Sequence, residues 1–111
     1  LSPMFRGILS TIYVDLNNDF FENKIYNILK KFHNKNKFVK ILNINSSIST
    51  NDVINTNYCF ISACKTKYKN KIVILSAIDN LIKGGAGQAV QNMNIKFGFE
   101  DFEGFKWKNF F

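Results

Sequence analysis

The chain has 111 residues, a length that fits one domain at most. Hydrophobic residues make up 46% of it, which is enough for a core, and no run of about 18 apolar residues predicts a membrane-spanning helix. The net charge of +7 would suit a phosphate-rich partner, but fourteen of the fifteen basic residues are Lys. Base and phosphate recognition favours Arg. We therefore expect no nucleic-acid partner and no membrane partner.

The first predicted elements are a strand and a helix. Residues 7–16 are β-branched and apolar, as in a strand with both faces partly covered. Residues 19–33 have the pattern of an amphipathic helix, in which Asp19 and Glu22 would form an N-terminal capping box. The apolar residues of this helix recur at helical spacing and are Phe21, Ile25, Ile28, Leu29 and Phe32.

Three more strands are predicted in the middle of the chain. Residues 38–44 have the pattern of a short strand, and the polar stretch that follows could hold a short edge strand near Val53. Residues 58–66 and 71–78 have the pattern of two strands joined by a hairpin.

A second helix is predicted to begin near Gly85 or Ala86 and to end before Gly98, which suits a C-cap. Its apolar stripe comprises Ala86, Ala89, Val90, Met93 and Phe97.

The predicted order is β-α-β-(β)-β-β-α, without a βαβ unit that opens with G-x-G-x-x-G. Hairpin-linked strands with few helices indicate an α+β fold with a mixed, mainly antiparallel sheet and helices on one face. We divide the chain into a domain, residues 1–97, and an aromatic tail, residues 98–111. The tail could pack on the sheet or on a partner through Phe102, Phe105, Trp107, Phe110 and Phe111.

The thiols and the single histidine suggest no catalytic or metal site. Cys59 and Cys64 lie five positions apart in a predicted strand, so their side chains should point to opposite faces. That geometry argues against a disulfide and against shared metal ligation, and free thiols fit a reducing cytoplasm. His33 lies near the end of a predicted helix, where the helix dipole favours it. We therefore predict a cytoplasmic protein without a metal site.

Residues 79–94 read DNLIKGGAGQAVQNMN, in which a polar pair ends a strand and a glycine-rich bend opens a helix. Such a bend leaves backbone N–H groups where an anion or a cofactor amide could dock, although a plain structural turn uses Gly equally well. Asp79 fits a cap of this bend better than a base. Arg6 is the only arginine; it could be a fork for a carboxylate or phosphate, or a partner in an ion pair.

Several stretches resemble the N-acetyl-gamma-glutamyl-phosphate reductase family, in the same order. Residues 79–94 resemble its C-terminal signature, and residues 3–14, PMFRGILSTIYV, resemble its Pro-Met-x-Arg-Gly-Ile-Leu segment. Residues 38–39 and 57–59 match shorter landmarks, and residues 93–99, MNIKFGF, resemble its closing helix and exit turn.

The resemblance implies the C-terminal part of an enzyme of arginine biosynthesis that reduces an acyl phosphate to a semialdehyde with NADPH. The family's cofactor domain, nucleophilic cysteine and acid/base histidine lie upstream of the part matched here. Cys59, Cys64 and His33 are therefore assigned no catalytic role, and this chain alone should not turn over substrate. The resemblance also implies a small-molecule acyl-phosphate substrate, an upstream cofactor-binding half to which the last helix returns, and a homo-oligomer.

The resemblance also suggests binding residues. Arg6 would lie next to the substrate pocket. Gln88 is the best candidate for a hydrogen bond to the cofactor, because its amide both donates and accepts, and Gly85 replaces the alanine usual in the family. The residues that the resemblance places beside the nicotinamide end of NADP are Asn80, Gly84, Gly85, Ala86, Gly87 and Gln88.

Two alternatives stay open. Aspartate-semialdehyde dehydrogenase has a similar helix start, but it usually has Asn where this chain has Gln88, and it lacks the Gln-Asn-Met-Asn ending. A non-catalytic dimerisation module would keep only the sheet and its dimer surface. Substrate assays would separate the two enzymes.

Overall fold

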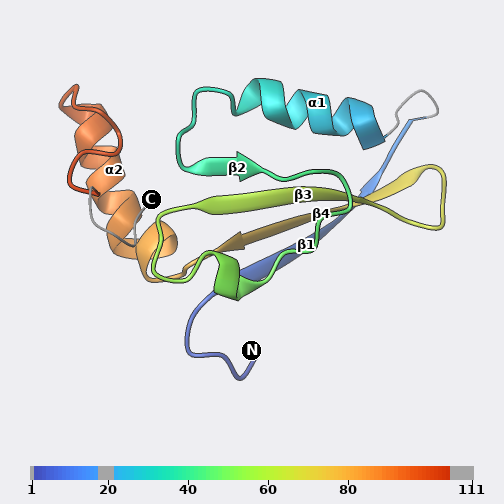
Figure 1. The fold of residues 1–111 in the computed structure, drawn as a ribbon, viewed down its shortest axis with the longest axis horizontal. Helices are drawn as coiled ribbons and strands as arrows, with labels where there is room; N and C mark the ends of the chain where they lie inside the picture. Colours follow the sequence, from blue (N-terminus) through green and yellow to red (C-terminus); the bar gives the residue numbers. More distant parts are fainter. Residues whose placement is uncertain (1, 18–21, 106–111) are drawn as a thin grey trace.

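The computed structural model describes residues 2–17 and 22–105. Its centre is a four-stranded sheet in the order β1-β4-β3-β2 (Figure 1). Within the described residues, no helix is long and apolar enough to cross a membrane. The α+β class with a mixed, mainly antiparallel sheet is confirmed.

The long strands form antiparallel pairs. β1 (Ile8–Asp15) pairs with β4 (Lys71–Ile78), which also pairs with β3 (Cys59–Lys65) in the predicted hairpin. These three strands lie where runs of β-branched and apolar residues predicted them, but β1 is exposed on both faces and not partly covered as expected. β2 (Val39–Ile41) is shorter than predicted and runs parallel to β3 at the sheet edge.

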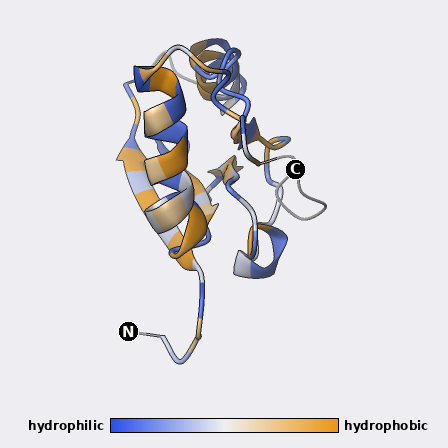
Figure 2. Cartoon of the chain, turned by 90° about the vertical axis from the view of Figure 1, so that its left-hand side faces the viewer, coloured by the Kyte–Doolittle hydropathy of each residue, from blue (hydrophilic) through white to orange (hydrophobic). Residues whose placement is uncertain are grey.

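Helix α1 (Glu22–Phe32) packs against β3 and β2. Ile25 and Leu29 are half-buried there, whereas Ile28 and Phe32 are exposed. Figure 2 views the molecule from the end at which the C-terminal helix lies, so α1 appears nearly end-on behind that helix. The predicted cap residue Asp19 lies outside the described residues.

The predicted edge strand near Val53 is wrong. A 3-10 turn, η1 (Thr50–Asp52), precedes Val53 instead. Ser49 caps this turn through its side-chain oxygen, and the Asp52 carboxylate accepts a hydrogen bond from the Ser49 N–H at 2.8 Å. Local capping of this kind outcompetes strand pairing, because it satisfies the backbone groups within the turn. Val53 is completely buried and packs with Ile48 and Ala77.

The C-terminal helix comes in two parts. A π-type turn, η2 (Ile82–Ala86), leads into α2 (Gly87–Lys96), so the regular helix begins one or two residues later than predicted. Gly98 is confirmed as the residue that ends the helix, with a φ of +73° and a hydrogen bond from its N–H to the Ile95 carbonyl. In Figure 1, α2 stands beyond the end of the sheet.

The apolar stripe of α2 faces away from the body of the molecule. Val90, Met93 and Phe97 are 36%, 49% and 68% exposed, whereas Gly87 and Asn94 are buried. Asn94 donates hydrogen bonds to the carbonyls of Asp101 and Glu103 and so binds the following loop. The helical periodicity is right, but the side that packs inward is the polar one.

The described part of the aromatic tail packs on this chain. Phe105 is 4% exposed, and its ring meets the buried ring of Phe38 edge-on at 5.0 Å. The Lys37 ammonium lies 3.8 Å from the centre of the Phe102 ring. Trp107, Phe110 and Phe111 lie outside the described residues.

Candidate functional site

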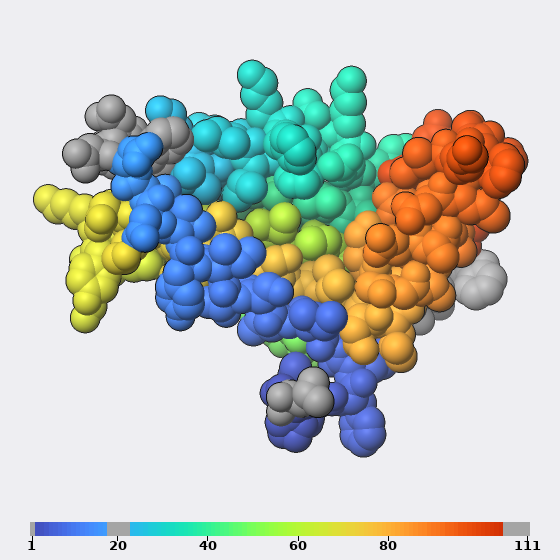
Figure 3. All heavy atoms as spheres, turned by 180° about the vertical axis from the view of Figure 1, so that it is seen from behind, coloured from blue at the N-terminus to red at the C-terminus, as the bar shows by residue number. Residues whose placement is uncertain are grey.

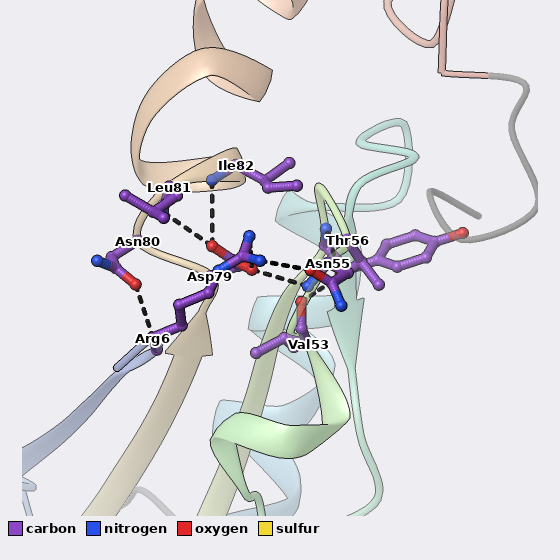
Figure 4. Close-up of polar contacts among 10 residues, drawn as sticks. Arg6, Val53, Asn55, Thr56, Asp79, Asn80, Leu81 and Ile82 are labelled. Atoms are coloured by element: carbon purple, nitrogen blue, oxygen red, sulfur yellow. Dashed lines mark hydrogen bonds and ion pairs between the residues drawn. The ribbon is translucent and has the colours of Figure 1, made fainter. Parts of the chain in front are cut away.

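The glycine bend (residues 81–87) is anchored by the Asp79 carboxylate (Figure 4). Oδ1 accepts hydrogen bonds from the N–H groups of Leu81 and Ile82 at 2.8 and 3.2 Å, and Oδ2 accepts one from the Asn55 N–H at 2.7 Å. Asp79 is completely buried. The structure therefore confirms Asp79 as a cap of the bend, as its position before the glycines predicted.

Arg6 completes this cluster. One terminal nitrogen of its guanidinium lies 2.7 Å from Asp79 Oδ2, and the other donates to the Asn55 side-chain oxygen at 2.5 Å. The Arg6 side chain is 29% exposed, yet its Nε is buried and has no hydrogen-bond partner among the described residues. The ion pair that the sequence left open for Arg6 is therefore formed.

Asn80 joins the bend to the start of β1. Its side-chain oxygen accepts a hydrogen bond from the Gly7 N–H at 2.7 Å across 73 residues of sequence. The two motifs that carry the family resemblance, around Arg6 and around Asp79, thus lie side by side at one end of the sheet (Figure 4).

The ionisation of Asp79 follows from this geometry. Burial alone would raise the pKa of its carboxyl group. Hydrogen bonds from the backbone of Asn55, Leu81 and Ile82, together with the Arg6 guanidinium, outweigh burial and hold the pKa below its ordinary value of 3.8. Asp79 therefore carries a negative charge at neutral pH, which suits a structural anchor and not a proton-accepting base.

A second polar cluster lies on the other side of the bend. Gln91 Oε1 accepts hydrogen bonds from the Lys83 ammonium at 2.7 Å and from Asn57 Nδ2 at 3.2 Å. Burial lowers the pKa of the Lys83 ammonium, against the opposing influence of Cys59 and Asp101. Asn57 is completely buried, and its Oδ1 has no hydrogen-bond partner among the described residues.

Gly87 fits closely against this second cluster. A Cβ atom at this position would lie 2.7 Å from the Ile82 carbonyl oxygen and would also overlap Asn57 Oδ1. The glycine is therefore required by close approach, because its backbone is in an ordinary helical conformation.

The bend keeps fewer free N–H groups than the sequence suggested. The side chain of Asp79 already accepts from Leu81 and Ile82. Three further N–H groups donate to backbone carbonyls within the segment, from Gly84 to Asp79, from Ala86 to Leu81 and from Gly87 to Ile82. The expected anion cradle is corrected accordingly, because the π-type winding uses these donors internally.

The predicted cofactor residues differ in exposure. Gly84, Gly85, Ala86 and Gln88 are exposed, Asn80 is half-buried and Gly87 is buried. The bend therefore presents small exposed residues next to the exposed side-chain amide of Gln88.

The thiols and the histidine lie apart from this arrangement. Cys59 Sγ lies 3.4 Å from the Ser76 hydroxyl, and Cys64 Sγ lies near the Ser46 carbonyl at 3.8 Å. His33 Nδ1 pairs with the Asn36 side chain at the surface. Across residues 2–17 and 22–105 there is no cluster of three His, Cys, Asp or Glu side chains that could hold a metal ion.

The sequence did not single out four residues that build the site. Asn55, Asn57, Lys83 and Gln91 come from ordinary polar stretches, and their partners lie 8 to 49 residues away in the sequence. Asn57, Lys83 and Gln91 fall within motifs of the resemblance, which was the one available signal.

Comparison with known proteins agrees with the motifs. The sequence pattern of the semialdehyde dehydrogenase dimerisation domain matches residues 1–80. The N-acetyl-gamma-glutamyl-phosphate reductase of Thermoanaerobacter pseudethanolicus is 48% identical over 101 residues, covering 91% of this chain and 29% of the relative.

Two other relatives show the same pattern. The enzymes of the same name from Halothermothrix orenii and Campylobacter jejuni are 42% and 43% identical, over 96% of this chain and 30% and 31% of their own lengths. The chain thus spans about 30% of the length of the relatives it matches. It belongs to the semialdehyde dehydrogenase family, whose dimerisation domain it shares.

Proposed function

We propose that this chain is the C-terminal part of an NADPH-dependent reductase that converts N-acetyl-gamma-glutamyl phosphate to N-acetylglutamate semialdehyde in arginine biosynthesis. The observation that carries the proposal is the 48% identity to a named reductase over 91% of the chain. The Gln-Asn-Met-Asn ending of the glycine motif supports this enzyme over aspartate-semialdehyde dehydrogenase. The cytoplasmic location stays a prediction.

The glycine bend is the proposed contact with the cofactor. Gly84, Gly85, Ala86 and Gln88 are exposed together, with Asn80 at the base of the bend and the buried Gly87 fixing its exit. When bound, NADPH supplies the hydride that reduces the acyl group. The part of these residues is to hold and orient the nicotinamide end, with Gln88 bonding its carboxamide. A substrate contact at Arg6 stays a prediction from the resemblance, although Asp79 and Asn55 already take both terminal nitrogens of its guanidinium.

The chemistry of the acyl group is assigned to residues outside this chain. Cys59, Cys64 and His33 are occupied by local hydrogen bonds and lie outside the family's nucleophile and histidine motifs. Alone, the chain should therefore bind and orient without turnover.

Two surfaces support the proposed partners. The stripe of α2 at Val90, Met93 and Phe97 is exposed and apolar, as expected if residues 1–97 include a helix that returns to a cofactor-binding half. Residues of β1 are exposed on both faces of the sheet, and Figure 3 shows this blue strand lying open across the back of the molecule. The family's dimerisation domain makes this strand the proposed contact between copies. This β1 surface comprises Ile8, Leu9, Ile12 and Tyr13.

The test is NADPH oxidation in the presence of N-acetyl-gamma-glutamyl phosphate. The chain is assayed alone and after mixing with a cofactor-binding half from the same source, with assembly checked by size-exclusion chromatography. The proposal is supported if the mixture oxidises NADPH and the chain by itself does not. An assembled but inactive mixture contradicts it and favours a purely structural module, and aspartyl phosphate as substrate tests the sister enzyme.

A further inference from the structure

Two neighbouring residues at the start of β1 pair with two neighbouring residues at the end of β4. Arg6 contacts the Asp79 carboxylate at 2.7 Å, and the Gly7 N–H donates to the Asn80 side chain at 2.7 Å. We call these four residues the clamp. Because the two contacts are adjacent, they fix both the position and the orientation of the backbone after β4. The clamp therefore determines the path of the chain from β4 into the glycine bend.

The Asp79 carboxylate connects the two sides of the clamp. Its Oδ2 faces Arg6 and the Asn55 N–H, while its Oδ1 receives the first N–H groups of the bend, those of Leu81 and Ile82. The carboxylate is completely buried, so water does not compete for these bonds. Charge-assisted hydrogen bonds of this kind are short and about twice as strong as neutral ones.

Arg6 holds the carboxylate in this orientation from one side. Its guanidinium also donates to the Asn55 side chain at 2.5 Å, which prevents rotation about the Arg6–Asp79 contact. A planar fork with two different acceptors has a single orientation, whereas a lysine ammonium would keep the charge and lose the second contact.

We infer that Arg6 is a positioning residue for the glycine bend and acts through Asp79. Its loss should weaken NADPH binding much more than binding of the acyl phosphate. The inference rests on the proposed function of the bend. It differs from a direct substrate contact in a measurable way, because a substrate contact at Arg6 would not involve Asp79.

The first experiment measures ligand affinity in the reductase assembled with its cofactor-binding half. NADPH binding is followed by fluorescence titration, and KM for N-acetyl-gamma-glutamyl phosphate is measured separately. In Arg6→Gln we expect the Kd for NADPH to rise about tenfold or more, since a bend that is no longer held in its binding conformation must be ordered when NADPH binds. The KM for the acyl phosphate should stay within about twofold, and Arg6→Lys should recover part of the loss.

Asp79→Asn tests the connection. Its amide would turn an N–H donor towards Arg6 and the Asn55 N–H, so the variant should reproduce the loss of NADPH affinity. Combining it with Arg6→Gln should cost little more than Asp79→Asn alone, because both changes break one unit. Lys71→Gln is the matched control: it removes a lysine from an exposed ion pair with Asp15 and should leave NADPH affinity unchanged.

Amide hydrogen exchange tests the clamp independently of the proposal that the glycine bend contacts the cofactor. In Arg6→Gln the amides of Leu81 and Ile82 should exchange faster, and unchanged exchange would overturn the clamp whatever the enzyme does. Faster exchange with unchanged NADPH affinity would show that the clamp exists but that the bend does not bind the cofactor. That outcome would overturn the positioning role through the proposed function of the bend. A rise confined to the KM for the acyl phosphate would assign Arg6 to the substrate and refute the inference.

Discussion

At the scale of single residues, Asp79 has the most influence on the site. It is buried, charged and bonded to three backbone N–H groups and one guanidinium. Buried charges are tolerated only with such partners, because desolvation otherwise costs several kcal/mol. The same arrangement ties the stability of the fold to pH.

We predict that Asp79→Asn removes an acid-sensitive part of the stability. Because the folded-state pKa of Asp79 lies below its ordinary value, the carboxylate stabilises the fold above about pH 4 and ceases to do so as the pH falls through the folded-state pKa. The variant should lose about 1.5–3 kcal/mol in the free energy of unfolding at pH 7. Urea unfolding followed by circular dichroism should show this difference shrinking below pH 4.

The control for this prediction is Asp15→Asn. Asp15 forms an exposed ion pair with Lys71, so its loss should cost less than about 1 kcal/mol. A difference between wild type and Asp79→Asn that stays constant down to pH 2 would contradict the prediction.

Gly87 gives a second prediction at this scale. Gly87→Ala should destabilise the fold by about 1–3 kcal/mol, since the added methyl group meets the Ile82 carbonyl at 2.7 Å and Asn57 Oδ1. Gly84→Ala adds the same methyl group within the bend, but its nearest contact is the flexible end of Ile78 at 3.3 Å, and the Asp79 carbonyl oxygen lies at an ordinary 3.6 Å. In thermal unfolding, the melting temperature of Gly87→Ala should be well below that of Gly84→Ala. Equal melting temperatures would refute the close approach of Gly87 to Ile82 and Asn57.

At the scale of elements, α2 is the unusual one. It packs inward through Gly87, Gln91 and Asn94, and its apolar residues face solvent. A helix normally buries its apolar stripe, so the outward stripe is consistent with the proposed contact between α2 and a cofactor-binding half.

We predict that Met93→Gln leaves the stability of this chain within about 0.5 kcal/mol of wild type, because Met93 is 49% exposed. The same change should weaken association with the cofactor-binding half by about tenfold, the equivalent of about 1.4 kcal/mol of lost apolar burial. Isothermal titration calorimetry measures this association. The control is Asn92→Gln, which changes the exposed polar residue next to Met93 and should bind like wild type.

At the scale of the whole molecule, the sheet is open at its β1 edge. The residues of the β1 surface are exposed to between 46% and 80%, and within residues 2–17 and 22–105 the strand pairs only with β4. An exposed apolar edge strand is a site for association, and soluble proteins normally cover such an edge or place charges on it.

We predict that the double change Leu9→Lys and Ile12→Lys, one on each face of β1, shifts the protein towards monomers. Charges at a strand contact oppose burial, so the dissociation constant should rise by about tenfold or more. Analytical ultracentrifugation measures the shift. Tyr68→Lys, which makes the same kind of change at an exposed hairpin residue, should leave the association as it is.

Local patterns in the sequence determined much of the fold. Three of these patterns depend on neighbours within a few residues: the apolar runs of the three long strands, the helical spacing of Ile25 and Leu29, and the C-cap at Gly98. Asp79 was predicted as a cap for the same reason, since its main partners, Leu81 and Ile82, directly follow it. Near Val53 the local signal misled, because an apolar residue in a polar stretch fits an edge strand and a buried turn equally well.

What only the tertiary structure decided depends on contacts between distant segments. The pairing of Arg6 with Asp79 and of Gly7 with Asn80 joins residues 73 positions apart, and nothing in either motif alone encodes it. The direction of the α2 stripe was equally hidden, because periodicity defines two faces of a helix without saying which one packs. The sequence by itself therefore determined the three long strands, the two α-helices and the family, and it named the candidate residues. The tertiary structure decided which of those residues hold each other and which surfaces are left for partners, because the long-range hydrogen bonds form only when the sheet brings its ends together.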